Sequence, residues 1–100
     1  MKKVFFIFLF FISTTAVADP KMELGLEVFN NKAQCGICHT LQAAGSIGNI
    51  GPNLDQLKTL KDQIVVSVTN GIGTMPAFEG TLSLEEIEAV AHYVFSSTNK

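Results

Sequence analysis

The sequence contains no tryptophan and no arginine, and it has only two cysteines and two histidines. Without clustered lysines and arginines it lacks the basic surface that binding to a phosphate backbone requires. After residue 18, the only aromatic side chains are Phe29, Phe78, Phe95 and Tyr93. No internal repeat occurs, and no alternation of apolar and polar residues indicates a strand. These absences exclude nucleic-acid binding and predict an all-α protein.

The first eighteen residues have the pattern of an export signal. Lys2 and Lys3 precede an apolar stretch from Val4 to Ile12, and Ala16-Val17-Ala18 provides a cleavage site. The stretch is shorter than the about 20 apolar residues that span a bilayer. We therefore expect residues 1–18 to be a cleaved signal peptide. No cysteine follows Ala18 directly to carry a lipid, so the exported form should be soluble and periplasmic, without a membrane span.

Residues 19–100 are then expected to form one domain. This part of the chain has five lysines and nine carboxylates, so its net charge is 5 − 9 = −4. A protein of this charge is expected to meet partners that carry basic patches, with encounter steered by charge and weakened by salt.

Both cysteines occur in the run Cys35-Gly36-Ile37-Cys38-His39. Cys-x-x-Cys-His is the signature of covalent haem attachment. Cysteines three residues apart lie on one face of a helical turn, where both can form thioethers along one haem edge. His39 follows directly, and its imidazole can supply an axial nitrogen to the iron. The motif predicts one covalently bound haem c per chain.

Three other interpretations of this motif have less support from the sequence. A redox dithiol belongs beside a βαβ pattern, which is absent. A zinc site needs two further ligands, and His92 is the only other histidine. A disulfide between Cys35 and Cys38 would close a loop too short to stabilise the fold much.

Helix signals mark the beginning and the end of the domain. Asp19-Pro20 predicts a helix that starts there and runs to about Lys32. Gly25 inside it is explained equally well by close contact with another helix and by chance. The final helix begins at the capping box Ser83-x-x-Glu86. Leu82 and Ile87 are placed to form a hydrophobic staple across this start, and the apolar stripe of the helix is Ile87, Val90, Ala91 and Val94.

Loops and one further helix are predicted between these two ends. The glycine-rich segment 41–53 has the composition of a loop. A helix that ends at Asn70-Gly71 is predicted by apolar residues at helical spacing, namely Leu57, Leu60, Ile64, Val65 and Val68. Met75 follows on an irregular segment, with two glycines before it and Pro76 after it.

Taken together, these motifs resemble those of the class I c-type cytochromes. The resemblance is carried by Cys35-x-x-Cys38-His39, Gly51-Pro52-Asn53-Leu54, Thr74-Met75-Pro76 and an aromatic C-terminal helix. It implies the cytochrome c fold, with three to five short helices wrapped around one covalently attached haem. It also implies that Gly25 lies where the first helix crosses the last.

The resemblance further implies the ligand set. Met75 would be the second axial ligand beside His39, and the carbonyl of Pro52 would accept a hydrogen bond from the His39 ring. A packing role for Met75 and coordination by His92 are the alternatives from the residues alone. His92 lies one turn after Glu88, which favours a solvated histidine paired with that carboxylate. Lys58, Lys61, Asn49 and Asn53 are candidate partners of the haem propionates.

With both axial positions filled, the iron has no place for a substrate, so the expected function is electron transfer and not catalysis. The segments 48–57 and 70–78 look most like cytochrome subunits of bacterial sulfite dehydrogenases. The expected function is a periplasmic carrier of single electrons between redox proteins. The alternatives are a tightly bound haem subunit of a dehydrogenase such as sulfite dehydrogenase, and a five-coordinate haem that binds a gas.

Overall fold

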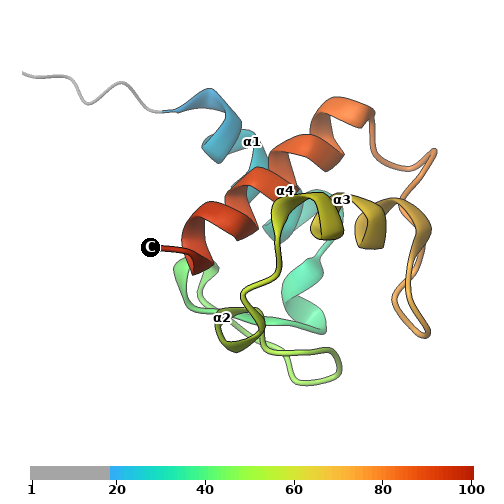
Figure 1. Cartoon of the computed structure of the whole chain (residues 1–100). Helices are drawn as coiled ribbons and strands as arrows, with labels where there is room; N and C mark the ends of the chain where they lie inside the picture. Colours follow the sequence, from blue (N-terminus) through green and yellow to red (C-terminus); the bar gives the residue numbers. More distant parts are fainter. Residues whose placement is uncertain (1–18) are drawn as a thin grey trace, which may run out of the picture.

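The computed structural model describes residues 19–100, so the export signal predicted for residues 1–18 lies outside the described residues. Between the loops, the regular structure of the described part is helical apart from one two-stranded ladder and two isolated bridges, which confirms the all-α prediction. In chain order its elements are α1 (Pro20–Glu27), a π-helical turn (Val28–Lys32), a 3-10 turn (Cys35–Ile37), β1 (Thr40–Leu41), a second 3-10 turn (Gln42–Ala44), β2 (Ser46–Ile47), α2 (Leu54–Leu57), α3 (Lys61–Asn70) and α4 (Leu84–Thr98). Figure 1 shows α4 running through the middle of the molecule with α1 and α3 beside it.

The first helix starts as predicted and changes its pitch in its second half. The side chain of Asp19 accepts a hydrogen bond from the Lys21 N–H, and Pro20 occupies the first turn, where its missing N–H costs nothing. From Val28 on, the chain forms a π-helical turn, closed by the Ala33 N–H on the Val28 carbonyl at 2.8 Å. The predicted end near Lys32 is confirmed, whereas nothing in the sequence signals the wider pitch.

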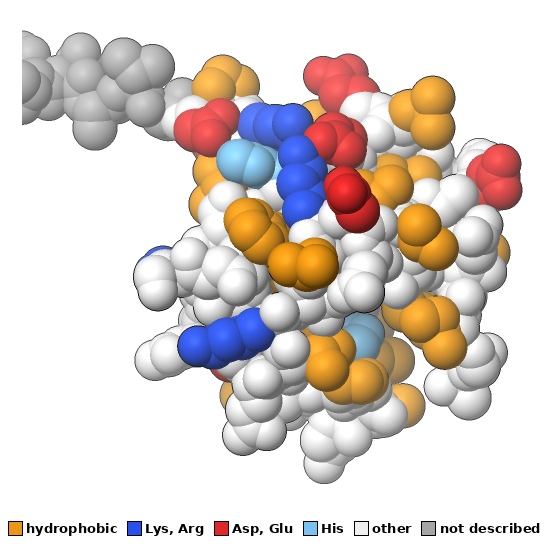
Figure 2. Space-filling model, viewed as in Figure 1, with side chains coloured by type: hydrophobic (Ala, Val, Ile, Leu, Met, Phe, Trp, Pro, Cys, Tyr) orange, Lys and Arg blue, Asp and Glu red, His pale blue; other side chains and the backbone are white. Residues whose placement is uncertain are grey.

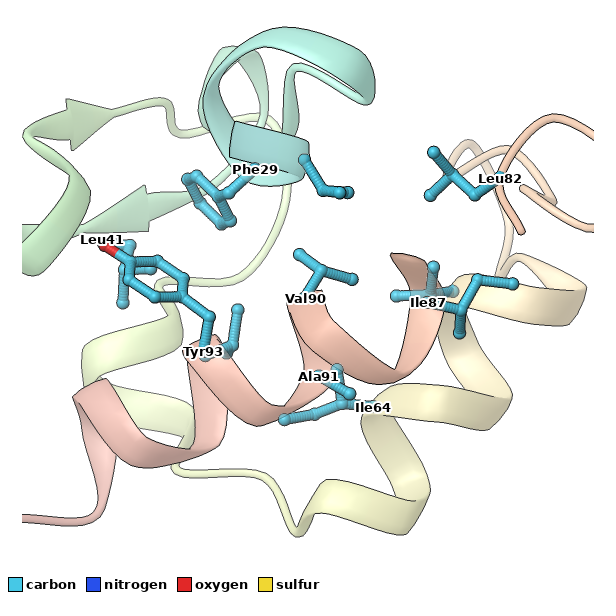
Figure 3. Close-up of a cluster of buried hydrophobic side chains, with 11 residues drawn as sticks. Phe29, Leu41, Ile64, Leu82, Ile87, Val90, Ala91 and Tyr93 are labelled. Carbon is cyan, nitrogen blue, oxygen red and sulfur yellow. The ribbon is translucent and has the colours of Figure 1, made fainter. Parts of the chain in front are cut away.

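Gly25 is the point where α1 crosses α4. A Cβ at this position would lie 2.3 Å from the Ala89 carbonyl oxygen and 2.4 Å from the Tyr93 Cβ, so only glycine lets the two helices approach this closely. One turn further along, the ring of Phe29 packs against Tyr93 with centroids 6.1 Å apart (Figure 3). Of the two explanations for Gly25, close helix contact and chance, the structure supports the first: Gly25 is required for helix packing.

The middle of the chain differs from the prediction. Lys58 has a left-handed backbone (φ 48°), which separates α2 from α3, and Leu60 is the residue before α3. Only Ile64 and Val68 of the predicted stripe are buried. Leu57 and Leu60 are 54% and 62% exposed, so their helical spacing does not reflect burial against another helix.

The last helix contributes more residues to the core than any other element. The Ser83 side chain accepts from the Glu86 N–H and the Glu86 carboxylate accepts from the Ser83 N–H, which confirms the capping box. Leu82 and Ile87 are both buried in the main hydrophobic cluster (Figure 3). The other members of this cluster are Val28, Phe29, Leu41, Ile64, Val68, Val90, Ala91, Tyr93 and Val94. Neither α4 nor any other helix between residues 19 and 100 is long and apolar enough to cross a bilayer.

Candidate functional site

The cysteine motif forms a short turn between the π-helical segment and β1. Gln34 enters this turn with a left-handed backbone (φ 51°), and the Cys38 and His39 N–H groups both donate to the Cys35 carbonyl, at 3.2 and 2.9 Å. Both cysteines are free thiols, so the structure gives no support to the disulfide alternative. Burial raises the pKa of the Cys35 thiol to about 11.

The loop after the motif packs directly against it. A Cβ on Gly36 would lie 2.6 Å from the Ser46 Cβ, and one on Gly48 would lie 2.5 Å from the Gly36 carbonyl oxygen. The Ser46 hydroxyl donates to the His39 carbonyl at 2.9 Å and accepts from the Leu41 N–H at 3.0 Å. Ser46 thus holds the backbone on both sides of Thr40, a role that its place in a glycine-rich loop did not indicate.

His39 is fixed by the segment that contains Pro52. Its Nδ1 lies 2.7 Å from the Pro52 carbonyl oxygen, which is the hydrogen bond implied by the family resemblance. A carbonyl oxygen only accepts, so Nδ1 must carry a proton, and in the neutral ring Nε2 then keeps its lone pair. Gly51 lies against the ring, since a Cβ there would be 2.7 Å from the His39 Cε1. The Gly51 N–H also donates to the Cys38 carbonyl at 2.7 Å, which joins this segment to the motif.

Met75 lies at the end of a tight turn. Its backbone N–H and carbonyl are both hydrogen-bonded to Ile72, at 2.9 and 3.1 Å, across Gly73, which has a positive φ of 57°. Gly71 also has a positive φ (72°), and a Cβ there would lie 2.6 Å from the Met75 carbonyl oxygen. Met75 is half-buried and packs against the main hydrophobic cluster.

The turn is attached to the end of α3. The Phe78 N–H donates to the Val68 carbonyl at 2.9 Å, and the Glu79 N–H donates to the Thr69 carbonyl at 3.3 Å. These bonds satisfy carbonyls at the end of the helix that would otherwise lack partners. The position of Met75 is therefore set by α3 and by two glycines.

A hollow of about 580 Å³ lies beside the Met75 turn. Its lining residues come from α2, from α3, from the short link between these helices and from the Met75 turn. They are Leu57, Thr59, Asp62, Gln63, Val66, Ser67 and Ile72. Ile72 and Val66 are 66% and 57% exposed. In the view of Figure 2, hydrophobic side chains are spread over the middle and the right of the molecule.

The spacing of His92 and Glu88 predicted that they pair, and this prediction is wrong. Its Nε2 lies 3.3 Å from an Asp19 carboxylate oxygen, whereas Glu88 contacts Lys21 at 3.3 Å and also Lys61. His92 pairs with Asp19 instead because α1 crosses α4 at Gly25 and brings Asp19 next to it. This histidine therefore connects the start of α1 to α4.

Two of the candidate propionate partners already have partners of their own. The Asn53 carbonyl oxygen Oδ1 caps α2 by accepting from the Asp55 and Gln56 N–H groups. Lys61 contacts Glu88. Lys58 and Asn49 are exposed.

The residues present fit a covalently bound haem. They provide two free thiols on one turn, an imidazole whose Nε2 is available for a metal, and a thioether on a rigid turn beside an apolar hollow. The hollow is lined by none of Cys35, Cys38, His39 and Met75, so the fit rests on these four side chains and not on the hollow.

Comparison with known proteins agrees with this geometry. Residues 20–94 match the family model described as cytochrome c oxidase, cbb3-type, subunit III. The chain is 42% identical over 82 residues to cytochrome c6 of Microcystis aeruginosa, an alignment that covers 76% of this chain and 96% of the relative. Cytochrome c6 of Leptolyngbya boryana is 40% identical over 88 residues, with 76% of this chain and 92% of the relative covered.

A solved structure shows the same fold. The c-type cytochrome SorU from Sinorhizobium meliloti superimposes with a TM-score of 0.74 and is 49% identical, covering 81% of this chain and 94% of that chain. The cytochrome c fold, the covalently bound haem c and a role in electron transfer between redox proteins, rather than in catalysis, follow from these comparisons. The chain belongs to the class I c-type cytochromes.

Proposed function

We propose that Cys35 and Cys38 form the thioethers to the haem and that His39 and Met75 are its axial ligands. The observation that carries this proposal is the 2.7 Å hydrogen bond from His39 Nδ1 to the Pro52 carbonyl oxygen. It selects the tautomer with a lone pair on Nε2 and orients the ring, as hydrogen bonds to metal-bound imidazoles do. Pro52 contributes through its carbonyl, while Gly51 limits the rotation of the ring.

Met75 would set the electron affinity of the site. When bound, the haem iron supplies one-electron oxidation and reduction. A thioether is a soft, uncharged donor, so a methionine at this position favours the reduced state, whereas a second histidine would lower the potential. Because both axial positions would be filled by the chain itself, the protein leaves no place for a substrate and acts as a carrier.

The proposed carrier works in the periplasm after removal of residues 1–18. Asp19 supports this cleavage site, because its side chain caps α1 and pairs with His92, and cutting after Ala18 leaves both contacts in place. N-terminal sequencing of the protein from a periplasmic extract should give Asp19 first. A cytoplasmic protein that retains Met1 contradicts the export proposal.

The proposed partners are redox proteins with basic patches, drawn to the net negative charge of residues 19–100. We propose a sulfite dehydrogenase as the electron donor, because segments 48–57 and 70–78 resemble its cytochrome subunits. The donor should reduce the cytochrome faster at low than at high ionic strength. Purification from the periplasm as a stable complex would instead identify the chain as a fixed subunit of a dehydrogenase.

Absorption spectra of the oxidised and reduced holoprotein test the ligand set. We expect the weak long-wavelength band of methionine-ligated ferric haem, and we expect Met75→Ala to lose it while keeping the covalent haem. Met22→Ala is the matched control, because Met22 is also half-buried and packs against the core, but on α1. Loss of the band in both variants or in neither contradicts ligation by Met75.

Carbon monoxide distinguishes the carrier from a gas-binding haem protein. The ferrous wild type should resist carbon monoxide, and Met75→Ala should bind it readily. Rapid, tight binding to the wild type would show that one axial position is open.

A further inference from the structure

His92 and Asp19 meet where the start of α1 lies against α4 (Figure 1). The Nε2 atom of His92 is 3.3 Å from the Oδ2 atom of Asp19. The side chains are 28% and 52% exposed, so an ion in solution can reach both. The other carboxylate oxygen, Oδ1, accepts from the Lys21 N–H at 3.0 Å, which fixes the orientation of the carboxylate. An imidazole nitrogen and a carboxylate oxygen thus converge on one accessible spot.

The separation of these two atoms suits a shared metal ion as well as a hydrogen bond. A tetrahedral zinc ion holds nitrogen and oxygen ligands at about 2.0–2.2 Å, which places neighbouring ligand atoms roughly 3.3–3.5 Å apart. Imidazole and carboxylate are both ligands of zinc in proteins. The hydrogen bond from the Lys21 N–H to Oδ1 can remain, since metal-bound carboxylates are commonly hydrogen-bonded through their second oxygen.

A third donor comes from the chain end that the proposed cleavage creates. No third His, Cys, Asp or Glu side chain among residues 19–100 joins the pair. Cleavage after Ala18, however, turns the main-chain nitrogen of Asp19 into a free α-amino group. This nitrogen and the carboxylate of the same residue can close a chelate ring around one ion. Together with His92 they give three protein ligands, the number typical of zinc sites that keep one position open.

Pro20 favours zinc over copper at this chain end. Copper(II) prefers square-planar sites. Chain ends provide such a site when the metal binds the α-amine together with the deprotonated amide nitrogen of the next residue. The residue after Asp19 is proline, which has no N–H and so no proton to release. Tetrahedral coordination by the α-amine and side chains remains.

The fourth position is left to water. Glu88 lies one turn before His92 on α4 and is the nearest further carboxylate along that helix. Its carboxylate contacts Lys21 at 3.3 Å and also Lys61, so it is already neutralised.

From these contacts we infer that the α-amino group and carboxylate of Asp19 and the imidazole of His92 form a binding site for Zn²⁺. The inference goes beyond the proposed carrier function, but it rests on the proposed cleavage after Ala18. The site uses none of the four side chains assigned to the haem. A bound ion would tie the first residue of the exported chain to α4.

Calorimetric titration of zinc chloride into the ferric holoprotein tests this inference. The first residue of the periplasmic protein is established by mass spectrometry before the titration. With His39 bound to the haem, His92 is the one remaining imidazole of the sequence. We expect one zinc ion per chain, bound at least about tenfold more weakly by His92→Gln, which loses the nitrogen ligand. Asp19→Asn should weaken binding to a similar degree, although asparagine caps a helix as well as aspartate does.

The α-amino group is tested separately. A mature chain with one extra alanine before Asp19, verified by its mass, keeps both side chains but moves the amine away from them. It should also bind zinc at least about tenfold more weakly, as expected for the loss of a ligand. Unchanged affinity in this variant overturns the assignment of the amine as a ligand.

Glu27→Gln is the matched control for Asp19→Asn. It removes the same charge from an exposed residue at the other end of α1 and should bind zinc like the wild type. Lack of saturable binding overturns the inference, as does equal affinity of the wild type and His92→Gln, or equal weakening in Glu27→Gln. A protein whose first residue precedes Asp19 overturns the cleavage proposal and this site with it. A chain that begins at Asp19 and binds no zinc overturns the site alone.

Discussion

The Nδ1 atom of His39 lies 2.7 Å from the carbonyl oxygen of Pro52, and Gly51 places its backbone against the same ring. One segment thus determines both the tautomer and the rotation of the imidazole. Because the carbonyl belongs to the main chain, replacing Pro52 removes rigidity but leaves the acceptor. Gly51 is the more sensitive position.

Gly51→Ala should displace His39. The new methyl would lie 2.7 Å from the ring Cε1, and relieving this overlap should cost about 1–3 kcal/mol of stability. We expect a lower denaturation midpoint and an altered ferric haem spectrum. Gly45→Ala is the control, because a Cβ there meets nothing within 4 Å and costs only the left-handed backbone strain, about 1–2 kcal/mol. A normal spectrum in Gly51→Ala would show that the ring tolerates the shift.

The Met75 turn contains two glycines for different reasons: both have a positive φ, but only Gly71 also lacks space for a Cβ. Both have positive φ, but a Cβ on Gly71 would collide with the Met75 carbonyl oxygen, whereas one on Gly73 meets nothing within 4 Å. Gly71→Ala should therefore weaken the long-wavelength band of methionine ligation, and Gly73→Ala should keep it with about 1–2 kcal/mol lost from stability. Spectra of the ferric variants, compared at equal haem content, check this. Loss of the band in Gly73→Ala would show that backbone strain alone moves Met75.

Gly25→Ala should destabilise the fold although alanine favours a helix. The methyl would lie 2.3 Å from the Ala89 carbonyl oxygen, a backbone atom that moves only with α4. The overlap should outweigh the gain in helix propensity of about 1 kcal/mol and leave a net loss of about 1–3 kcal/mol. Glu27→Ala, on the exposed side of the same helix, should change the unfolding free energy by less than about 0.5 kcal/mol. Denaturant unfolding of the holoproteins measures both.

The features that the sequence predicted well are those with local causes. The capping box at Ser83 and the helix start at Asp19 depend on neighbouring residues only, and both are present. The cysteine motif also lies within five consecutive residues. In contrast, the pairing of His92 with Asp19 depends on how α1 crosses α4, which spacing along one helix cannot show.

The middle of the chain shows a second limit of prediction from sequence patterns. Leu57 and Leu60 have the spacing of a buried helix stripe, yet both are exposed. Between them Lys58 ends α2 with a left-handed backbone that lysine rarely adopts. An apolar residue that faces a cofactor is indistinguishable in sequence from one that faces another helix. The hollow beside α3 was therefore hidden from sequence patterns alone.

The lowered pKa of Glu86 should make the stability of the fold depend on pH. Its contacts with Lys32 and with the Ser83 N–H lower the pKa of its carboxyl from an ordinary 4.5 to about 2. The depressed pKa means that the folded state binds this proton less readily than the unfolded state. The stabilisation is therefore complete above about pH 4.5 and is lost as the pH falls toward about 2.

Glu86→Gln isolates this effect, because glutamine can still accept the hydrogen bond from the Ser83 N–H that completes the capping box. The variant should be less stable than the wild type at pH 7, and the difference should shrink between pH 4.5 and 2. Urea midpoints measured across this range test it, with Lys32→Met as an independent way to remove the pair. Because the pair is at the surface, added salt should also reduce the difference at pH 7. A constant gap between wild type and Glu86→Gln at every pH would mean that the ionisation of Glu86, and with it the charge contact with Lys32, does not contribute to stability.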